Sequence, residues 1–155
     1  MAHGLGNDFI VIDGINQTFA PNPARIAQWA NRHFGIGFDQ LLLVERAQTP
    51  AADFRYRIFN ADGGEVQQCG NGARCFGKYL RDHSLHPLDR PLRVAVKRGS
   101  ITIAYVGAGE DGSEQYRVDM GEPDFTPFTA AQTERLYQPV SAAGHELQMG
   151  IVSMG

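Results

Sequence analysis

The chain has 155 residues, of which 43% are apolar and 20% charged, and this composition suffices for a hydrophobic core without disulfide or metal support. The formal net charge of -3 gives no basic footprint for nucleic acid or for an anionic membrane surface. No apolar run approaches the roughly 18 residues of a membrane span, and the first residues lack the features of a signal peptide, so we expect a cytoplasmic protein.

The first half of the chain predicts three strands and one helix. The strands are short apolar or alternating runs at residues 8–13, 40–45 and 54–59. Asn22 is the predicted N-cap of a helix that begins at Pro23 and is closed by Gly35. Its predicted buried face consists of Ile26, Trp29, Ala30 and Phe34.

The second half predicts a central helix between β-rich segments. Glycine-rich turn chemistry at residues 60–64 precedes a short strand at 65–68. A helix then follows Gly70, with a buried stripe of Ala73, Phe76, Gly77 and Leu80. Strands are predicted at 93–97, 100–106, 115–120 and 145–154, with an irregular stretch at 121–128 and a helical turn or two at 129–135. We expect one compact α+β unit with about seven strands and two helices.

The two cysteines have different surroundings in the sequence. If both lie on one helix, Cys69 and Cys75 are about 9 Å apart along its axis and roughly 120° apart around it, which is too far for a disulfide. Cys69 directly precedes the glycine-rich start of the helix, where unpaired backbone N–H groups favour a thiolate. It is therefore a candidate general acid or base, or alternatively a small buried residue at a tight turn. Cys75 lies inside the helix and is predicted to be structural.

Other patterns carry less chemistry when each is taken singly. The segments 4–6 and 72–78 resemble nucleotide-binding loops, but the first has no preceding strand and the second lacks the Ser or Thr that would hold magnesium. The five histidines show no metal-ligand spacing, so no metal site is predicted. Amide side chains at element edges and turns can simply satisfy backbone groups, and those of interest are Asn7, Gln40, Asn60 and Asn71.

Five segments together resemble the diaminopimelate epimerase family in content, order and spacing. They are residues 3–13, 35–43, 59–75, 120–123 and 152–155. The resemblance implies two similar lobes, each a β-roll wrapped around a central helix, with one catalytic cysteine from each lobe facing the other. Residues 1–155 would form the N-terminal lobe, and the C-terminal lobe would be absent.

The resemblance also implies a reaction and a set of site residues. Cys69 would be one of two acid/base thiols, and the backbone N–H groups of Gly70 and Asn71 would hold the α-carboxylate of the substrate. The side chains that match substrate-contacting positions are those of Asn7, Gln40 and Asn60. The implied reaction interconverts LL- and meso-diaminopimelate on the bacterial route to lysine and peptidoglycan, with no cofactor and no metal.

This sequence departs from the family pattern in three places, and it leaves two alternatives open. Gly64 stands where the family commonly has serine, the start is shortened, and the family motif at 152–155 does not continue. We therefore expect the chain to be cut and to be inactive or nearly so alone. The alternatives are a related isomerase of the same fold, such as a proline racemase or a phenazine-pathway enzyme, and a non-catalytic lobe that binds ligand or self-associates. A homodimer would bring two Cys69 thiols face to face.

Overall fold

The structure is a computed structural model that describes residues 1–123 and 138–149. It divides into two units, Met1–Met120 and Gly121–Gly155. The predicted helical turn at 129–135, most of the irregular stretch at 121–128 and the motif at 152–155 lie outside the described residues. Neither helix of the described part is long and apolar enough to cross a membrane.

The first unit is built on one mixed eight-stranded sheet, which agrees with the predicted α+β class. The strands follow the order β1-β2-β3-β4-β6-β7-β8, and β5 pairs with β4. β2 and β3 are parallel, as are β4 and β6, and the other pairs are antiparallel. The bounds are β1 (Ala2–Gly4), β2 (Asn7–Asp13), β3 (Gln40–Arg46), β4 (Phe54–Asn60), β5 (Glu65–Val66), β6 (Leu92–Ala95), β7 (Ser100–Ala108) and β8 (Glu114–Asp119). Each strand predicted in this unit is confirmed, and β1 is additional.

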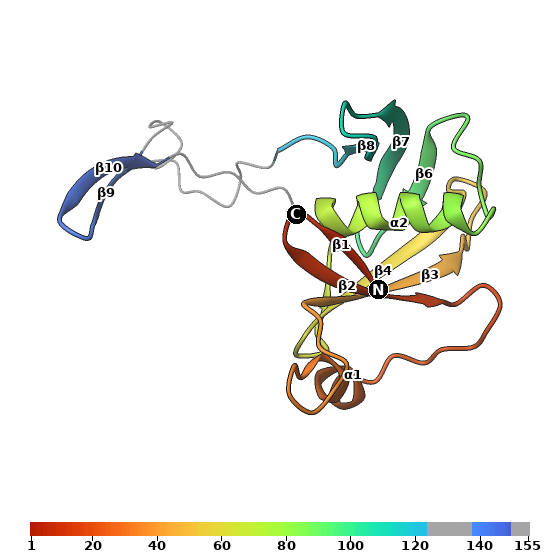
Figure 1. Cartoon of the computed structure of the whole chain (residues 1–155), viewed down its shortest axis with the longest axis horizontal. Helices are drawn as coiled ribbons and strands as arrows, with labels where there is room; N and C mark the ends of the chain where they lie inside the picture. Colours follow the sequence, from red (N-terminus) through yellow and green to blue (C-terminus); the bar gives the residue numbers. More distant parts are fainter. Residues whose placement is uncertain (124–137, 150–155) are drawn as a thin grey trace. The chain divides into compact units, whose positions relative to one another are not determined.

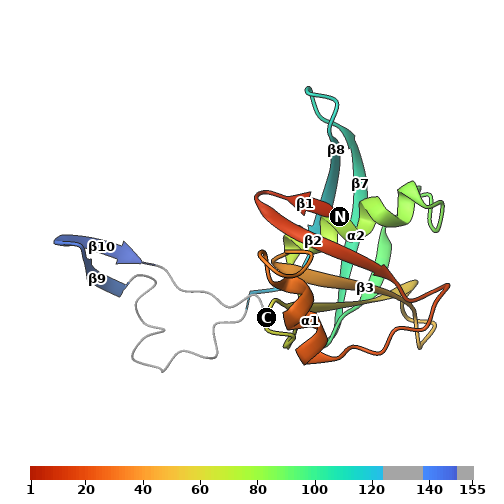
Figure 2. The same cartoon turned by 60° about the horizontal axis from the view of Figure 1, so that its bottom comes forward.

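The sheet curls around the helix α2 (Gly70–Asp82). This helix contacts β1, β2 and β3 as well as β7 and β8, so strands from both ends of the sheet reach it. Figure 1 and Figure 2 show α2 between the β1–β4 part and the β6–β8 part of the sheet. The predicted buried stripe is confirmed, and Phe76 and Leu80 are fully buried within it. The main hydrophobic core therefore lies between α2 and the concave face.

The helix α1 (Pro23–Ala30) covers the opposite face of the sheet, where it forms a second core. β3 runs between the two cores. Leu42 and Val44 belong to the core around α2, whereas Leu41 and Leu43 belong to the core around α1. Because β3 is buried on both faces, its sequence is an uninterrupted apolar run rather than an alternating one.

The predicted end of α1 is wrong by one turn. The N-cap prediction is confirmed, since the Asn22 side chain accepts a hydrogen bond from the Arg25 N–H. At the other end, Asn31 Oδ1 accepts the N–H groups of His33 at 2.8 Å and Phe34 at 2.9 Å, and the helix ends at Ala30. An asparagine side chain that bonds to nearby backbone competes with the helical pattern. Phe34 is consequently 91% exposed instead of buried.

The remaining β-structure consists of hairpins. The predicted β6–β7 hairpin is confirmed, with Gly99 at a φ of +80° in its turn. The second unit contains an antiparallel pair of β9 (Gln138–Ala142) and β10 (His145–Met149). β10 confirms the described part of the predicted last strand, and β9 was not predicted.

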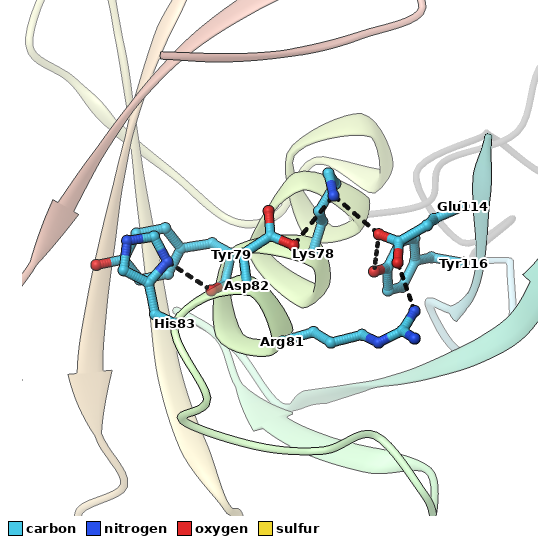
Figure 3. A network of polar contacts seen from close by, with 7 residues as sticks. All are labelled: Lys78, Tyr79, Arg81, Asp82, His83, Glu114 and Tyr116. Atoms are coloured by element: carbon cyan, nitrogen blue, oxygen red, sulfur yellow. Dashed lines mark hydrogen bonds and ion pairs between the residues drawn. The ribbon is translucent and has the colours of Figure 1, made fainter. Parts of the chain in front are cut away.

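Polar contacts join the exposed face of α2 to β8 (Figure 3). Glu114 on β8 accepts hydrogen bonds from Lys78 Nζ at 2.8 Å and from Arg81 at 2.5 Å. The Tyr116 hydroxyl donates to the same carboxylate at 3.0 Å. The Lys78 ammonium lowers the pKa of Glu114. These contacts join the polar side of α2 to β8, opposite the apolar stripe.

A further ion pair connects the start of β4 to the segment before β6. It makes the folding stability depend on pH. The Arg90 guanidinium donates to Asp53 at 2.8 and 3.2 Å, and the Arg93 N–H donates to the same carboxylate at 2.8 Å. Chiefly because of Arg90, the pKa of Asp53 falls from 3.8 to about 2. A carboxyl group with a lowered pKa in the folded state stabilises the protein above its unfolded pKa. This contribution is lost as the pH falls from about 4 to about 2.

We therefore predict that Asp53→Asn lowers the free energy of unfolding at neutral pH and that the difference from the wild type shrinks toward pH 2. Urea unfolding over this pH range measures both quantities. Glu110→Gln, which changes an exposed carboxylate between β7 and β8, is the control. A constant difference between Asp53→Asn and the wild type at all pH values would contradict the assignment.

A second prediction concerns the close packing of α2 at Gly72. A Cβ at this position would overlap the hydroxyl oxygen of the buried Tyr56 and would lie 3.1 Å from Leu42 Cδ2. We expect Gly72→Ala to lower the free energy of unfolding by about 1–2 kcal/mol, because overpacking outweighs the gain in helix propensity. Urea unfolding measures this cost. In a Tyr56→Phe background, which lacks the hydroxyl, the loss of stability should be smaller. An equal loss in both backgrounds would contradict an overlap with the Tyr56 hydroxyl.

Candidate active site

Cys69 occupies the N-cap position of α2. Its backbone is extended, with φ -149° and ψ 116°, and its side chain makes no capping hydrogen bond. Its carbonyl oxygen accepts the Ala73 N–H at 2.8 Å. Cys69 is half-buried and packs against the core around α2. It directly precedes the first N–H groups of the helix, which have no acceptor within the helix itself. This is the position that the sequence predicted for an acid/base thiol.

Tyr56 forms a hydrogen bond with the backbone of Cys69. Its hydroxyl donates to the Cys69 carbonyl oxygen at 3.4 Å, and the side chain is 1% exposed. Burial raises the pKa of Tyr56, so the hydroxyl stays protonated and can only be used as a neutral donor at this point. The absence of a side chain at Gly72 leaves the space that this hydroxyl needs.

Cys75 has a different environment, in agreement with its predicted structural role. It is 7% exposed, and burial raises the pKa of its thiol. A Cβ at Gly4 would lie 3.3 Å from Cys75 Sγ, so β1 approaches the thiol closely. Cys75 and Tyr79 line a cavity of about 460 Å³, and none of the six predicted site residues lines it.

The amides of Asn7, Gln40 and Asn60 lie on the same face of the sheet as α2. Side chains two residues apart in a strand share a face. Each amide stands two residues away from a side chain of the core around α2. The three pairs are Asn7 and Phe9, Gln40 and Leu42, and Asn60 and Ile58. The pairing register places Gln40 between Phe9 and Asn60. The three amides therefore lie at neighbouring strand ends, on the same side of the sheet.

Hydrogen bonds join these three amides and that of Asn71 into two pairs. Gln40 Nε2 donates to Asn60 Oδ1 at 2.9 Å, across neighbouring strands. Asn71 Nδ2 donates to Asn7 Oδ1 at 2.9 Å, which connects the first turn of α2 to the start of β2. All six predicted residues, Cys69, Gly70, Asn71, Asn7, Gln40 and Asn60, thus lie around the start of α2 or at the sheet edge next to it.

Sequence reasoning missed the charged residues that border this set. Asp39 Oδ2 accepts from Asn7 Nδ2 at 3.4 Å and from the Asp8 N–H at 2.9 Å, and Asp39 Oδ1 accepts from Arg32 at 2.8 Å. Arg74 donates to Asn71 Oδ1 from the next turn of α2. Asp39 directly precedes Gln40 inside one of the matching segments, but Arg32 falls in the region that was predicted to be helical.

This arrangement combines a thiol at the start of a helix with backbone and side-chain amides. A thiol can give or accept a proton, and backbone N–H groups at a helix start bind carboxylates. The neutral amides supply both donors and acceptors without adding charge. Together these groups offer hydrogen-bond donors and acceptors to a small polar ligand.

A family model and individual relatives in other organisms agree on one protein family for this chain. A family model described as diaminopimelate epimerase matches residues 1–126. The diaminopimelate epimerases of Nitrosomonas europaea and Chromobacterium violaceum are each 51% identical over 156 residues, which covers 99% of this chain and 54% of each relative. The chain thus spans about half the length of the curated relatives that it matches.

Solved structures share the fold at low sequence identity. A hydroxyproline epimerase from Agrobacterium vitis matches with a TM-score of 0.62 at 14% identity. The match covers 97% of this chain and 46% of the chain of that protein. A predicted epimerase from Pseudomonas aeruginosa has a TM-score of 0.60 at 18% identity, with coverage of 97% and 51%. These likenesses support the predicted lobe fold, and the family follows from the sequence matches: the chain belongs to the diaminopimelate epimerase family.

Proposed function

We propose that this chain supplies one thiol and half of the substrate-binding cleft of an enzyme that interconverts LL- and meso-diaminopimelate. The observation that carries the proposal is the position of Cys69 at the N-cap of α2, where its side chain makes no capping hydrogen bond and where the first turn of the helix carries Asn71 of one amide pair. The match of residues 1–126 to the family model supports the choice of reaction.

Inversion at an α-carbon needs a base on one face and an acid on the other. In the LL to meso direction, a thiolate opposite Cys69 removes the α-proton, and the electron pair remains on the α-carbon. The Cys69 thiol then delivers its proton to the opposite face of the same carbon and becomes a thiolate. In the reverse direction the two groups exchange roles. Because a single thiol cannot occupy both faces, the second group must come from another segment or from another copy of the chain.

The carbanion formed in this step is stabilised through the α-carboxylate. The backbone N–H groups of Gly70 and Asn71 point out of the helix start, where the helix dipole also favours negative charge. Donors placed in advance at developing charge lower the barrier without reorganising during the reaction. The missing side chain at Gly70 leaves room for Met120, since a Cβ there would lie 3.1 Å from Met120 Sδ.

The pair of Gln40 and Asn60 supplies complementary groups. After Gln40 Nε2 has donated to Asn60 Oδ1, Gln40 retains its carbonyl oxygen and Asn60 retains its NH₂ group. The oxygen can accept from a substrate ammonium, and the NH₂ group can donate to a substrate carboxylate. This pair thus favours an amino acid over a substrate that carries only carboxylates.

A related racemase or isomerase of the same fold is the competing assignment. The Agrobacterium vitis structure contains bound trans-4-hydroxy-L-proline, but that protein is 14% identical to this chain, whereas the diaminopimelate epimerases are 51% identical. The difference favours diaminopimelate.

The proposal is tested by following α-proton exchange by NMR in D₂O. In a chimera of residues 1–155 with the remaining half of the Nitrosomonas europaea relative, we expect exchange of the α-proton of LL-diaminopimelate. Cys69→Ala should slow it by about 10²–10⁴-fold, which is the usual contribution of an acid/base group. The isolated chain should show no exchange.

Cys75→Ala is the control for the Cys69 substitution, because Cys75 is the other thiol of the chain and is buried within α2. It should retain exchange in the chimera. Exchange that survives Cys69→Ala would contradict the role of this thiol, and exchange of proline in place of diaminopimelate would favour the related racemase. Exchange by the isolated chain would instead indicate a working homodimer.

A further inference from the structure

A continuous series of hydrogen bonds runs from Arg32 to Arg74 along one side of the candidate site. Arg32 donates to Asp39, which accepts from Asn7. Asn7 accepts from Asn71, which in turn accepts from Arg74. The series joins the loop after α1, the loop before β3, the start of β2 and the first two turns of α2, segments that are up to 64 residues apart in the sequence.

The chemistry of its ends fixes the direction of every hydrogen bond in this series. A guanidinium has only donors, and an ionised carboxylate has only acceptors. Asn7 must therefore present its NH₂ group to Asp39, which leaves its oxygen for Asn71. Asn71 must present its NH₂ group to Asn7, which leaves its oxygen for Arg74. Neither amide can rotate by 180° without placing two donors or two acceptors against each other.

Fixed amides leave defined donors for a ligand. Each NH₂ group carries two hydrogens, and those of Asn7 and Asn71 each make one hydrogen bond within residues 1–123 and 138–149. Both residues are half-buried. One N–H of each amide therefore remains for a ligand, beside the backbone N–H groups that start α2.

We propose that Asp39, held by Arg32, is a positioning residue that orients the Asn7 and Asn71 amides so that both present N–H donors to a substrate carboxylate. The identity of the ligand rests on the proposed function, whereas the orientation of the amides does not. Asp39 does not touch the substrate itself and acts through Asn7.

Asp39 is well placed to hold this orientation. The Asp8 N–H and then the Arg32 guanidinium lower the pKa of Asp39, so its side chain remains an acceptor at neutral pH. Arg32 also donates to Asp8 at 2.8 Å, and one guanidinium thus holds both carboxylates. The Asp39 side chain is 37% exposed, compared with 20% for Asp53, so its ion pair is more accessible to solvent and contributes less to folding stability. Substitutions at Asp39 are therefore expected to fold.

Asp39→Asn provides the test, because it keeps the shape of the side chain while allowing it to donate. Asn7 then no longer has an acceptor-only partner and can reverse. The matched control is Asp53→Asn, since Asp53 also accepts from an arginine and from a backbone N–H but lies at the start of β4, away from Asn60. The readout is the ¹⁵N–¹H spectrum of the side-chain amides in the ligand-free chain.

We expect Asp39→Asn to shift and broaden the NH₂ signals of Asn7 and Asn71, while the backbone spectrum stays folded and Asp53→Asn leaves both signals unchanged. Arg32→Lys should give an intermediate shift, because a lysine keeps the charge but cannot bridge two carboxylates as a guanidinium does. Asn7 and Asn71 signals that are the same in Asp39→Asn as in the wild type would overturn the proposal.

A second arm separates this inference from the proposed function. Titration of the chimera with LL-diaminopimelate should give binding about tenfold weaker, or more, for Asp39→Asn than for Asp53→Asn. Equal affinities of the two variants would overturn the positioning role for the ligand. If the wild type does not bind diaminopimelate but the ligand-free amide signals still change in Asp39→Asn, the proposed substrate fails while the oriented amides stand.

Discussion

The burial of α2 in the curled sheet is the constraint on which the site depends. Gly72 and Gly77 let the helix approach its neighbours so closely that a Cβ at either position would collide with a side chain of the sheet. Such contacts leave the helix no freedom to slide or rotate, because packed interiors contain few voids. Since Cys69 is the N-cap residue of this helix, the packing of the apolar stripe of α2 also fixes the backbone position of Cys69.

The topology of the sheet brings the polar residues to the same place. β2 and β3 are parallel and begin side by side, and β4 is antiparallel to β3 and ends beside its start. Asn7, Gln40 and Asn60 occupy these three ends, on the face that α2 covers. A strand end can carry a polar side chain without interrupting the core, because the next residue inward on that face is already apolar.

Local patterns in the sequence were sufficient for most of the elements but not for the contacts that orient the site. Periodicity predicted the stripe of α2, and the uninterrupted apolar run of β3 predicted a strand. The end of α1 was missed because the Asn31 side chain bonds to the backbone, which periodicity does not report. The Asp39–Asn7 and Asn7–Asn71 bonds join residues 32 and 64 apart, so only the folded topology reveals them. The grouping of the six site residues came from the family resemblance.

The requirement for a second acid/base group follows from how the two thiols of this chain differ. Cys69 is half-buried at the helix start, whereas Cys75 is buried in the core and its raised pKa keeps it a neutral thiol. Both belong to the same helix, so they cannot face each other across a substrate carbon. Two-base inversion at one carbon therefore needs a group from another segment or another copy, placed opposite Cys69. A half-buried thiol at the start of a helix, with amide side chains close by, can supply the acid/base group on only one face of such a carbon.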